Sequence, residues 1–419
     1  MIPKPIFTSL SPNAERDDIK ASLSLILKPF CWKKTKKAEE LEEKFKKRFR
    51  TEYAFSVNSG RSGLILILKA IGIKKGDEVL LQGFTCNAAV NPILRLGAVP
   101  VFVDIDETLN LDPNDLERKI TGKSRAVIVQ HTFGWPARIE QIKKIAEEKG
   151  LFLIEDCAHS LGASYKGEFC GSFGDAAFFS FGRDKVISSV FGGMITVRKQ
   201  DLAEKIRKEW ENLELPSLFW IFQQLLHPFL CWFFVIPAYA LNQHLGRLLL
   251  GAFHRLSILS KSVYKKEKKG EIPSHFPARM PDALASLALR QFSKLEGFNR
   301  HRKEVARLYE RELEGFKAPF AASERDRQPA YLKYPVLVEV DTDELLKQAR
   351  KRKIYLDDGW RKSPVVPPDT DLGIMKYVKG SCPEAEKAAL KIVNLPCHIG
   401  INQKEARKVV SLLKSYAKR

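Results

Sequence analysis

The sequence predicts an α/β protein whose core is a mainly parallel sheet with helices packed on both faces. Two observations lead to this class. Short apolar runs recur between residues 53 and 199, and segments with helical character, such as 61–72 and 137–150, separate several of them. Near-continuous apolar strands that alternate with helices are typical of a parallel sheet that is buried on both faces.

The expected elements follow in chain order. Residues 38–50 place acidic and then basic side chains at helical spacing, which predicts a solvent-facing helix with supporting i,i+4 pairs. The expected strands are 53–60, 77–84, 99–106, 125–132, 151–158, 176–182 and 192–199. After Val197 this alternation stops. Further on, 283–315 has the pattern of a long helix, and 331–340, 343–356 and 402–419 predict a small α+β unit closed by a helix.

The length of the chain bears on its domain organisation. A chain of 419 residues is too long for one simple core, so we expect one large and one smaller domain. We predict a large domain over 1–270, with a hydrophobic insertion at about 211–262, and a small C-terminal α+β domain over 271–419. Because ligands of parallel sheets bind at the C-terminal ends of the strands, functional side chains are expected there, in the large domain.

Composition narrows the partners and the compartment. The formal net charge of +20 favours anionic partners such as nucleotides, phosphorylated substrates or an acidic membrane surface. No basic segment interleaved with aromatic residues is present, so nucleic acid is not an expected partner. The seven cysteines are odd in number, irregularly spaced and without a CxxC pair, which argues against a disulfide framework or a metal site and for a reducing compartment. The N-terminus has no long apolar stretch of the kind that begins a secretion signal, so a cytoplasmic location is expected.

Three stretches at strand ends carry candidate chemistry. The stretch "FFSFGRDKVISSVFGG" places Lys185 among buried-type residues, where a lysine is costly. The stretch "VNSGRSG" follows a strand and opens a helix, so Gly60, Arg61 and Ser62 form a candidate anion site at a helix N-terminus. Asp156 ends another apolar strand, where it either caps the next turn or holds a cationic ligand group, and Ser180 is a hydroxyl at a third strand end.

These candidate residues together fit the cofactor pyridoxal phosphate (PLP). This cofactor needs a phosphate cradle, an acid that keeps its ring nitrogen protonated, and an amine that forms a Schiff base. The candidate anion site, Asp156 and Lys185 meet these needs in order. The alternative for Lys185 alone is a lysine that reaches the surface and pairs with Asp184 or Asp175.

From about Pro12 onward, apart from the apolar segment after Val197, the chain resembles the DegT/DnrJ/StrS aminotransferases, many of which act on nucleotide sugars. The resemblance is carried by "NSGRSGL", "IKKGDEVLLQGFTCNAAVNPILRLGAVPVFVDID", "IVQHTFGWPARIEQI", "LIEDCAHSLGASYKG", "GSFGDAAFFSF" and "NLPCHIG". It implies a fold type I PLP-dependent transferase, a role such as polysaccharide biosynthesis, and a homodimer with active sites at the subunit interface.

The resemblance also assigns roles to residues. It implies that Lys185 is the Schiff-base lysine, that Asp156 is the acid on the pyridine nitrogen, and that Ser180 binds the phosphate. Gly60 and Arg61 match the phosphate loop. His159 falls where the family usually has Gln near the 3-hydroxyl of the cofactor, and Cys86 falls where the family has an aromatic residue stacked on its ring, a place that Phe84 could take instead.

Other positions depart from the family pattern. Arg61 replaces the usual Thr, and either adds a cation to the phosphate site or points away from it. The family's GEGG after the lysine is VFGG here, Val190–Gly193. Its Asn-x-Arg-Met, thought to reach the neighbouring subunit's phosphate, is "PARM", so Pro277 cannot supply that contact. These changes leave the Schiff-base chemistry in place and alter the substrate pocket.

The resemblance implies an aminotransferase that moves an amino group from an amino acid, expected to be glutamate, to a keto acceptor, expected to be a nucleotide-linked keto-sugar. Two alternatives remain: another PLP reaction on a lipid-linked or hydrophobic substrate, and a non-catalytic membrane-bound sensor with this fold. Lys185 argues against the sensor, and against the dehydratases of the family that lack this lysine.

The segment from Leu215 to Gly246 contains no Asp, Glu, Lys or Arg, and we predict that it contacts a membrane. Trp220, Trp232 and Tyr239 are residues that favour membrane interfaces. Polar residues and prolines interrupt the segment and both flanks are basic, so a shallow hairpin or an in-plane helix at the cytoplasmic face is expected rather than one full span. The alternative is a buried dimer interface.

Overall fold

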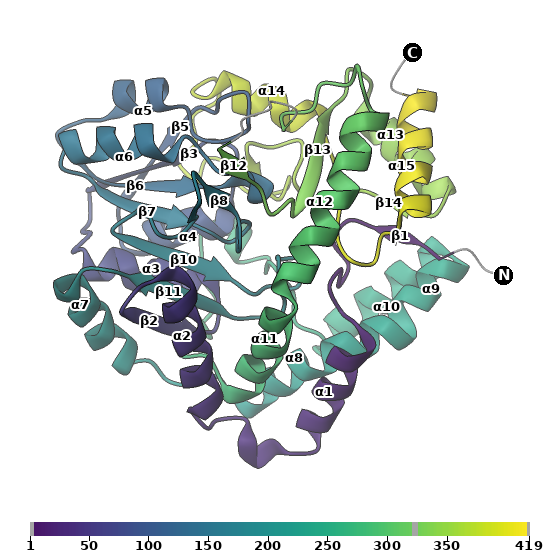
Figure 1. The fold of residues 1–419 in the computed structure, drawn as a ribbon, viewed down its shortest axis with the longest axis horizontal. Helices are drawn as coiled ribbons and strands as arrows, with labels where there is room; N and C mark the ends of the chain where they lie inside the picture. The colour runs from purple at the N-terminus through teal and green to yellow at the C-terminus, as the bar shows by residue number, and fades with distance from the viewer. Residues whose placement is uncertain (1–3, 321–325, 417–419) are drawn as a thin grey trace.

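The computed structural model describes residues 4–320 and 326–416, and Figure 1 shows a central sheet flanked by helices. The main strands are β2 (Tyr53–Val57), β3 (Glu78–Gln82), β5 (Val99–Val103), β6 (Ser124–Gln130), β7 (Phe152–Asp156), β10 (Ala176–Ser180) and β11 (Gly193–Val197). They form one seven-stranded sheet in the order β2-β11-β10-β7-β6-β3-β5. Only β11 runs antiparallel to its neighbours, so the expected strands and the mainly parallel α/β class are confirmed.

Helices cover both faces of the sheet because successive strand residues point to opposite sides. On β10, Ala176 and Phe178 pack into one cluster, whereas Ala177 and Phe179 pack into another. The first face carries α3 (Gly60–Ala70), α4 (Asn87–Arg95) and α7 (Gln200–Glu211). The opposite face carries α2 (Lys36–Phe49), α5 (Pro113–Lys119), α6 (Ile139–Glu148) and α11 (Asp282–Ser293). A sheet covered on both faces exposes its ligand site only at a strand edge.

The register of the sheet brings three loops together at that edge. Gly193 lies opposite Ser180 on one side and Val57 on the other. Asp156 lies opposite Phe178, two residues before the end of β10. The ends of β2, β7 and β10 therefore meet at the C-terminal edge, where the sequence predicts the site.

The C-terminal part forms a smaller α+β unit. It contains α12 (Leu295–Glu312), α13 (Thr342–Lys351), α14 (Pro383–Lys391), α15 (Gln403–Tyr416) and the antiparallel pair β13 (Lys333–Leu337) and β16 (Ile392–Pro396). The long helix expected over 283–315 is divided, because the Lys294 N–H donates to Gln291 O, a three-residue step that ends α11 before α12 begins.

Short strands join distant parts of the chain. Near the N-terminus, β1 (Ile6–Phe7) pairs with β14 (Ile354–Tyr355), so the first strand lies with the C-terminal unit, and α1 (Arg16–Ile26) follows it. At the edge of the large sheet, β4 (Thr85–Cys86) pairs with β15 (Val365–Val366). A third small sheet holds β8 (Ser164–Tyr165), β9 (Glu168–Phe169) and β12 (Arg327–Gln328). The division at residue 270 stays a prediction.

The hydrophobic insertion folds into helices. These are α8 (Leu218–Leu230), a π-helical turn (Cys231–Val235), α9 (Ile236–Leu241) and α10 (Gln243–Arg255). Trp220, Ile221 and Leu225 of α8 are buried in the core beside α1 and α11. The chain turns back at Asn242, and α10 packs on α9 where Gly246 faces the ring of Tyr239. A Cβ at Gly246 would lie 2.4 Å from that ring, so only glycine allows this contact.

One helix of the described chain, Leu218–Leu241, is long and apolar enough to cross a membrane by length and composition. Half of its most apolar window is buried inside the protein, and this buried half includes the core residues of α8. A transmembrane span would have to withdraw those side chains from the core, which favours a helix that stays on the protein and exposes one side.

A buried histidine makes stability depend on pH. His398 accepts a hydrogen bond from Gly400 N–H at Nδ1 and donates from Nε2 to Phe7 O. Burial lowers the pKa of His398 from 6.5 to about 4. Below pH 6.5 the unfolded chain therefore takes up a proton that the folded chain does not, and stability falls until both forms are protonated below about pH 4.

We therefore expect His398→Gln, which keeps both hydrogen bonds without titrating, to flatten the acid side of the stability profile. Between pH 6.5 and pH 4 the unmodified protein should lose about 3 kcal/mol relative to this variant. Thermal or urea unfolding at several pH values measures the difference. Parallel profiles for the two proteins would contradict the assignment.

Candidate active site

A cavity of about 350 Å³ opens at the C-terminal edge of the sheet, within the size range of cofactor and ligand sites. Seven of the eight predicted site residues line it: Gly60, Arg61, Cys86, Asp156, His159, Ser180 and Lys185. The eighth, Ser62, lies beneath the wall, where its hydroxyl donates to Asn58 Oδ1 at 2.6 Å and its N–H donates to Ser59 Oγ. The structure therefore brings seven of the predicted site residues together in one cavity, and Ser62 stabilises the turn at the start of α3.

The backbone around Lys185 is held from two directions. Asn13 Nδ2 donates to Lys185 O at 2.5 Å, and the Arg302 guanidinium donates to Val186 O at 2.7 Å. The amine of Lys185 forms no ion pair with any described residue. Asp175 pairs with Lys199, and Asp184 lies 4.0 Å from Lys333, so the alternative in which one of these acids pairs with Lys185 does not describe the structure.

Asp156 combines the two roles that the sequence allowed. Its Oδ1 accepts the Ala158 N–H at 2.9 Å, which caps the turn after β7. Within the described chain its second oxygen accepts no hydrogen bond, and the residue lines the cavity. Burial raises the pKa of Asp156, against the opposing effects of the Ala158 hydrogen bond and the Lys185 charge. A buried carboxylate with one open oxygen is suited to a cationic ligand group.

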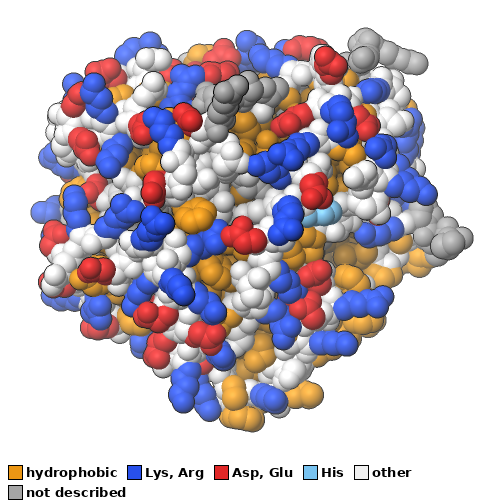
Figure 2. Space-filling model, in the orientation of Figure 1, with side chains coloured by type: hydrophobic (Ala, Val, Ile, Leu, Met, Phe, Trp, Pro, Cys, Tyr) orange, Lys and Arg blue, Asp and Glu red, His pale blue; other side chains and the backbone are white. Residues whose placement is uncertain are grey.

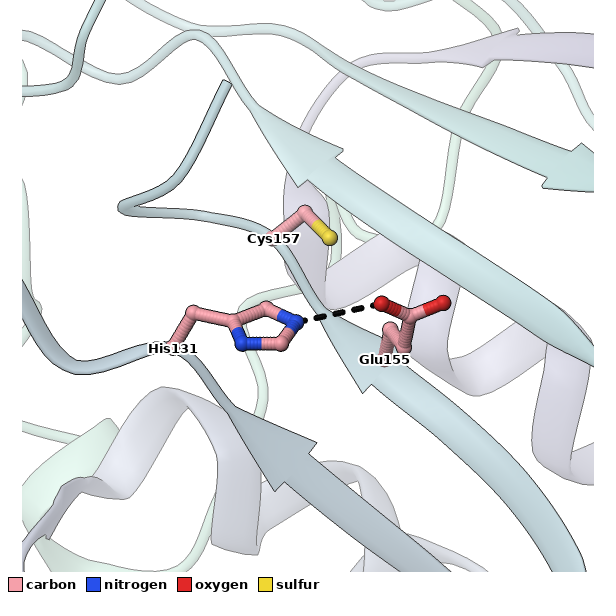
Figure 3. Close-up of side chains that lie close together, drawn as sticks. All are labelled: His131, Glu155 and Cys157. Atoms are coloured by element: carbon pink, nitrogen blue, oxygen red, sulfur yellow. Dashed lines mark hydrogen bonds and ion pairs between the residues drawn. The ribbon is translucent and has the colours of Figure 1, made fainter. Parts of the chain in front are cut away.

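The residues on either side of Asp156 fix the end of β7 (Figure 3). His131 donates from Nε2 to Glu155 at 3.1 Å, beside the thiol of Cys157. The Glu155 carboxylate also accepts the backbone N–H groups of Gly171, Phe173 and Gly174. Burial raises the pKa of Glu155, but the bonds from His131 and the backbone outweigh it and hold that pKa below its usual value.

Although His131, Glu155 and Cys157 lie close enough to hold a metal ion, the lone pairs of His131 and Glu155 are already in use. The carboxylate has four donors, and His131 Nδ1 accepts the Ala137 N–H at 3.0 Å. This cluster therefore has a structural role, in which it holds the end of β7 in place beneath the cavity.

His159 is placed to act as a neutral donor. Its Nδ1 accepts the Phe133 N–H at 3.3 Å, which leaves the ring proton on Nε2. Burial holds the pKa of His159 well below its usual value, and the charges of Lys185 and Lys333 act in the same direction. A neutral imidazole with its proton on Nε2 can donate to an oxygen of a bound ligand.

Phe178, Phe191 and Trp360 are aromatic residues of the cavity wall, and the sequence analysis missed Trp360. Its ring centroid lies 5.0 Å from that of His159, and it lines the cavity. Phe84 is fully buried and packs against Trp360 from behind, so it does not take the place of the family's stacking residue. Cys86 lines the cavity, and burial raises the pKa of its thiol.

Two glycines allow the turn before α3, which holds the candidate anion site, to lie close to the end of β10 and the start of β11. A Cβ on Gly60 would lie 3.2 Å from Ser180 Cβ, and one on Gly193 would lie 2.7 Å from Phe179 O and 2.8 Å from Gly60 N. Ser59 caps α3 by accepting the Ser62 N–H, which leaves the first N–H groups of the helix without helical partners. Such a helix start is a ready anion site.

The side chain of Arg61 is engaged by the end of the insertion. Its guanidinium forms an ion pair with the fully buried Glu267 and donates to Ser262 O at 3.2 Å. This segment of the same chain supplies Ser262, Val263 and Lys268 to the cavity wall. The sequence analysis missed these residues, together with Arg183, Asp184 and Asp358. Asp184 and Arg183 stand directly before Lys185, which was the one available signal for them.

The residues fit pyridoxal phosphate. The cavity combines three features. They are the Lys185 amine, which forms no ion pair with a described residue, the buried Asp156 carboxylate, which has one oxygen without a hydrogen bond, and the N-terminus of α3 beside the Ser180 hydroxyl. These match the aldehyde, the ring nitrogen and the phosphate of that cofactor.

Fold and site define a fold type I PLP-dependent aminotransferase. Residues 13–414 match the DegT/DnrJ/EryC1/StrS aminotransferase family, and the chain belongs to that family. PLP and PMP forms of a Streptococcus pneumoniae protein share the fold with TM-scores of 0.76.

Several relatives cover different shares of the chain. A Methanocaldococcus jannaschii protein is 29% identical over 90% of this chain and 89% of its own length. The GDP-perosamine synthase of Escherichia coli O157:H7 is 39% identical over 43% of this chain and 50% of its own length. The spore coat polysaccharide biosynthesis protein SpsC of Bacillus subtilis is 32% identical over 68% of this chain and 64% of its own length.

Among solved structures, S. venezuelae DesV is 25% identical with a TM-score of 0.73, covering 96% of this chain and 95% of that one. DesI, solved in the presence of its TDP-sugar product, is 21% identical with a TM-score of 0.74, covering 100% of this chain and 95% of that one. At such identities DesI supports the fold.

Proposed function

We propose that this aminotransferase moves an amino group from glutamate to a keto-sugar carried on a nucleotide, in the cytoplasm. The observation that carries the proposal is Lys185 without an ion pair, in one cavity with the open oxygen of Asp156. The relatives named for GDP-perosamine synthesis and for a TDP-sugar product support the acceptor class. The net charge of +20 suits a phosphorylated substrate.

Each side chain has a task in this reaction. PLP supplies an aldehyde that condenses with amines and a ring that draws electrons from the neighbouring carbon. Lys185 would hold the cofactor between turnovers and would move the proton during transfer. Asp156 would hold a proton on the ring nitrogen through its open oxygen, and Nε2 of His159 would be free to donate to the ring hydroxyl. Trp360 and Cys86 would contribute to the wall around the cofactor.

A half-reaction tests this function. Mixing the PLP-loaded protein with glutamate should convert the bound cofactor and release one 2-oxoglutarate per site. The aminated protein is then offered a panel of nucleotide keto-sugars, and mass spectrometry identifies the aminated product. Carbon dioxide release or elimination products would assign the chain to another PLP reaction. Failure to react with any amino acid would favour the non-catalytic sensor.

We also propose a homodimer, which is the usual state of this family. Light scattering on the purified protein, with and without detergent, measures it. A mass of one chain, which is 47.6 kDa, would overturn the proposal.

The insertion exposes an apolar surface, which we call the α8–α10 face. Its members are Leu218, Phe219, Trp232, Phe233, Phe234, Leu241, Leu245, Leu248 and Leu256, with Leu27 and Phe30 beyond the end of α1. Figure 2 shows hydrophobic side chains gathered along the lower right margin, where Figure 1 places α8, α9 and α10. Isolated apolar residues are normal on surfaces, but this many large exposed ones on helices that pack together favour a docking surface.

We propose that the α8–α10 face docks on an anionic membrane surface. Exposed cations adjoin its apolar residues in the sequence: Lys28 follows Leu27, Arg247 lies between Leu245 and Leu248, and Arg255 precedes Leu256. Apolar side chains that enter the acyl boundary and cations that meet lipid phosphates characterise in-plane helices.

The structure also sets the design of the test. Deleting the insertion would remove Trp220, Ile221 and Leu225 from the core, so point substitutions are required. We expect a fourfold variant to bind phosphatidylserine vesicles at least about 10-fold more weakly; it changes Phe233, Phe234, Leu245 and Leu248 to Ser. The reason is that each of these exposed side chains would add to the free energy of binding by burying its apolar area in the membrane.

The matched control changes Val378 and Leu390 to Ser, since these residues are exposed to a similar degree outside the α8–α10 face. It should bind vesicles normally. Two results together would overturn the membrane proposal: the unmodified protein does not bind anionic vesicles, and it is a dimer whereas the fourfold variant is a monomer. In that case the α8–α10 face is a dimer interface.

A further inference from the structure

Arg183 is a cation in the cavity wall without an acidic partner. Among the described residues its guanidinium donates one hydrogen bond, to Ser260 Oγ at 2.5 Å, and forms no ion pair. Its Nε is buried and bonds to nothing in the described chain. Burial lowers the pKa of Arg183 to about 10, which still leaves it charged at neutral pH. A buried cation of this kind calls for an anion from outside the chain.

The position of Arg183 indicates which anion. Arg183 and Arg61 lie over the same ring, with their guanidinium carbons 5.4 and 5.7 Å from the centroid of Phe191. Arg61 lies in the first turn of α3, so Arg183 shares an aromatic neighbour with a residue of that turn. The same cavity wall holds Gly60 and Ser180, the predicted phosphate contacts. The unpaired cation therefore lines the same cavity as the start of α3.

The neighbouring cation is already neutralised. Arg61 is paired with the buried Glu267, which also accepts the Tyr264 N–H at 2.7 Å. Lys268 is paired with Asp369. Arg183 is thus the cation at this end of the cavity that forms no ion pair with a described residue, although the charge of the neighbouring Asp184 acts to raise its pKa.

The insertion holds Arg183 in place. Ser260, which accepts the bond from Arg183, donates in turn to Gln224 Oε1 at 2.7 Å. Gln224 is fully buried on α8, and its amide donates to Trp220 O at 2.8 Å. This chain of contacts fixes one end of the guanidinium from the side of the insertion, while Arg183 lines the cavity and also a smaller pocket beside His227.

We propose that Arg183 binds the phosphate of PLP within the same chain, a proposal that rests on the proposed function only in that PLP is the cofactor. The guanidinium offers a planar fork of donors that suits phosphate oxygens. "PARM" adds no donor here: Ala278 exchanges hydrogen bonds with Asn58 in the turn before α3, and Pro277 has neither an N–H nor a polar side chain. Arg183 would therefore contact the phosphate bound to the same chain and replace a contact that Pro277 cannot make.

The experiment compares two cofactors that differ only in the phosphate. Arg183→Gln should weaken PLP binding by about 10- to 100-fold, the range for a hydrogen bond to a charged group, as measured by absorbance titration of the apoprotein. Binding of pyridoxal, which lacks the phosphate, should change less than about 3-fold. Arg207→Gln is the matched control, because this arginine also lies over an aromatic ring, Phe55, but outside the cavity.

Two further measurements keep the proposal falsifiable if Arg183→Gln folds poorly. Ser260→Ala removes the hydroxyl that positions the guanidinium and should give a smaller loss, again for PLP only. Phosphorus NMR of bound PLP should show a dianion across pH 5–8 in the unmodified protein, whereas the variants should titrate near the ordinary value of about 6.

Each outcome decides the proposal. A selective loss of PLP affinity supports it, even if the protein fails to aminate any sugar. Equal losses for PLP and pyridoxal would reduce Arg183 to a structural residue. Unchanged PLP affinity with weaker binding of a nucleoside diphosphate would assign Arg183 to the acceptor and overturn the proposal.

Discussion

Replacing Lys185 by alanine is expected to abolish transamination. Lys185 is the amine in the cavity that forms no ion pair among the described residues, and its backbone is held in place by Asn13 and Arg302. Loss of the proton transfer alone should slow turnover by at least about 100- to 10,000-fold. Borohydride reduction of the unmodified protein should fix PLP to the peptide that contains Lys185, and the variant should show no such peptide.

The matched control for this variant is Lys199→Ala. Lys199 is exposed and pairs with Asp175, outside the cavity, so its loss should leave turnover and cofactor attachment unchanged. Arg302 also bonds to Val186 O, so the turn around position 185 should keep its structure in the alanine variant. Full activity in Lys185→Ala would show that the proposed mechanism is wrong.

The second large effect is expected for Asp156→Asn. The amide oxygen can still accept the Ala158 N–H, so the turn after β7 should fold normally. It cannot hold a proton on the ring nitrogen of the cofactor, and electrostatic contributions of this kind are worth roughly 100- to 1,000-fold in rate. Steady-state kinetics together with PLP titration and thermal unfolding separate the loss of rate from any loss of structure.

Asp175→Asn is the matched control, because it makes the same chemical change at a surface ion pair. It should keep full activity. An Asp156→Asn protein that binds PLP and turns over like the unmodified protein would leave Asp156 with the capping role alone.

The sequence allowed the sheet and the positions of the main site residues to be predicted because their signals are local. Strand runs are continuous stretches, and Asp156 and Ser180 stand at the ends of such runs. In a parallel sheet those ends must meet at one edge, so the order of the strands need not be known to place them together. The family motifs then assigned Lys185, and the match over residues 13–414 confirms the family.

Other parts of the site depend on contacts between distant residues. Trp360 enters the cavity because β15 pairs with β4, although these strands are far apart in the chain. Nothing near Trp360 in sequence marks it as a ligand residue. The open question about Arg61 was likewise answered by Glu267, a partner that no local pattern identifies.

The sequence by itself determined the α/β class, the PLP chemistry and the apolar character of residues 215–246, since each follows from residue types at short spacing. The tertiary structure decided how the insertion is used: its inner side is buried against the core, its outer side is exposed, and its end holds Arg183 and Arg61 at the cavity. The physical reason is that burial and charge pairing are properties of the packed chain. Whether an apolar helix faces a core or a membrane, or a buried cation has a counter-charge, depends on the residues that folding brings beside it.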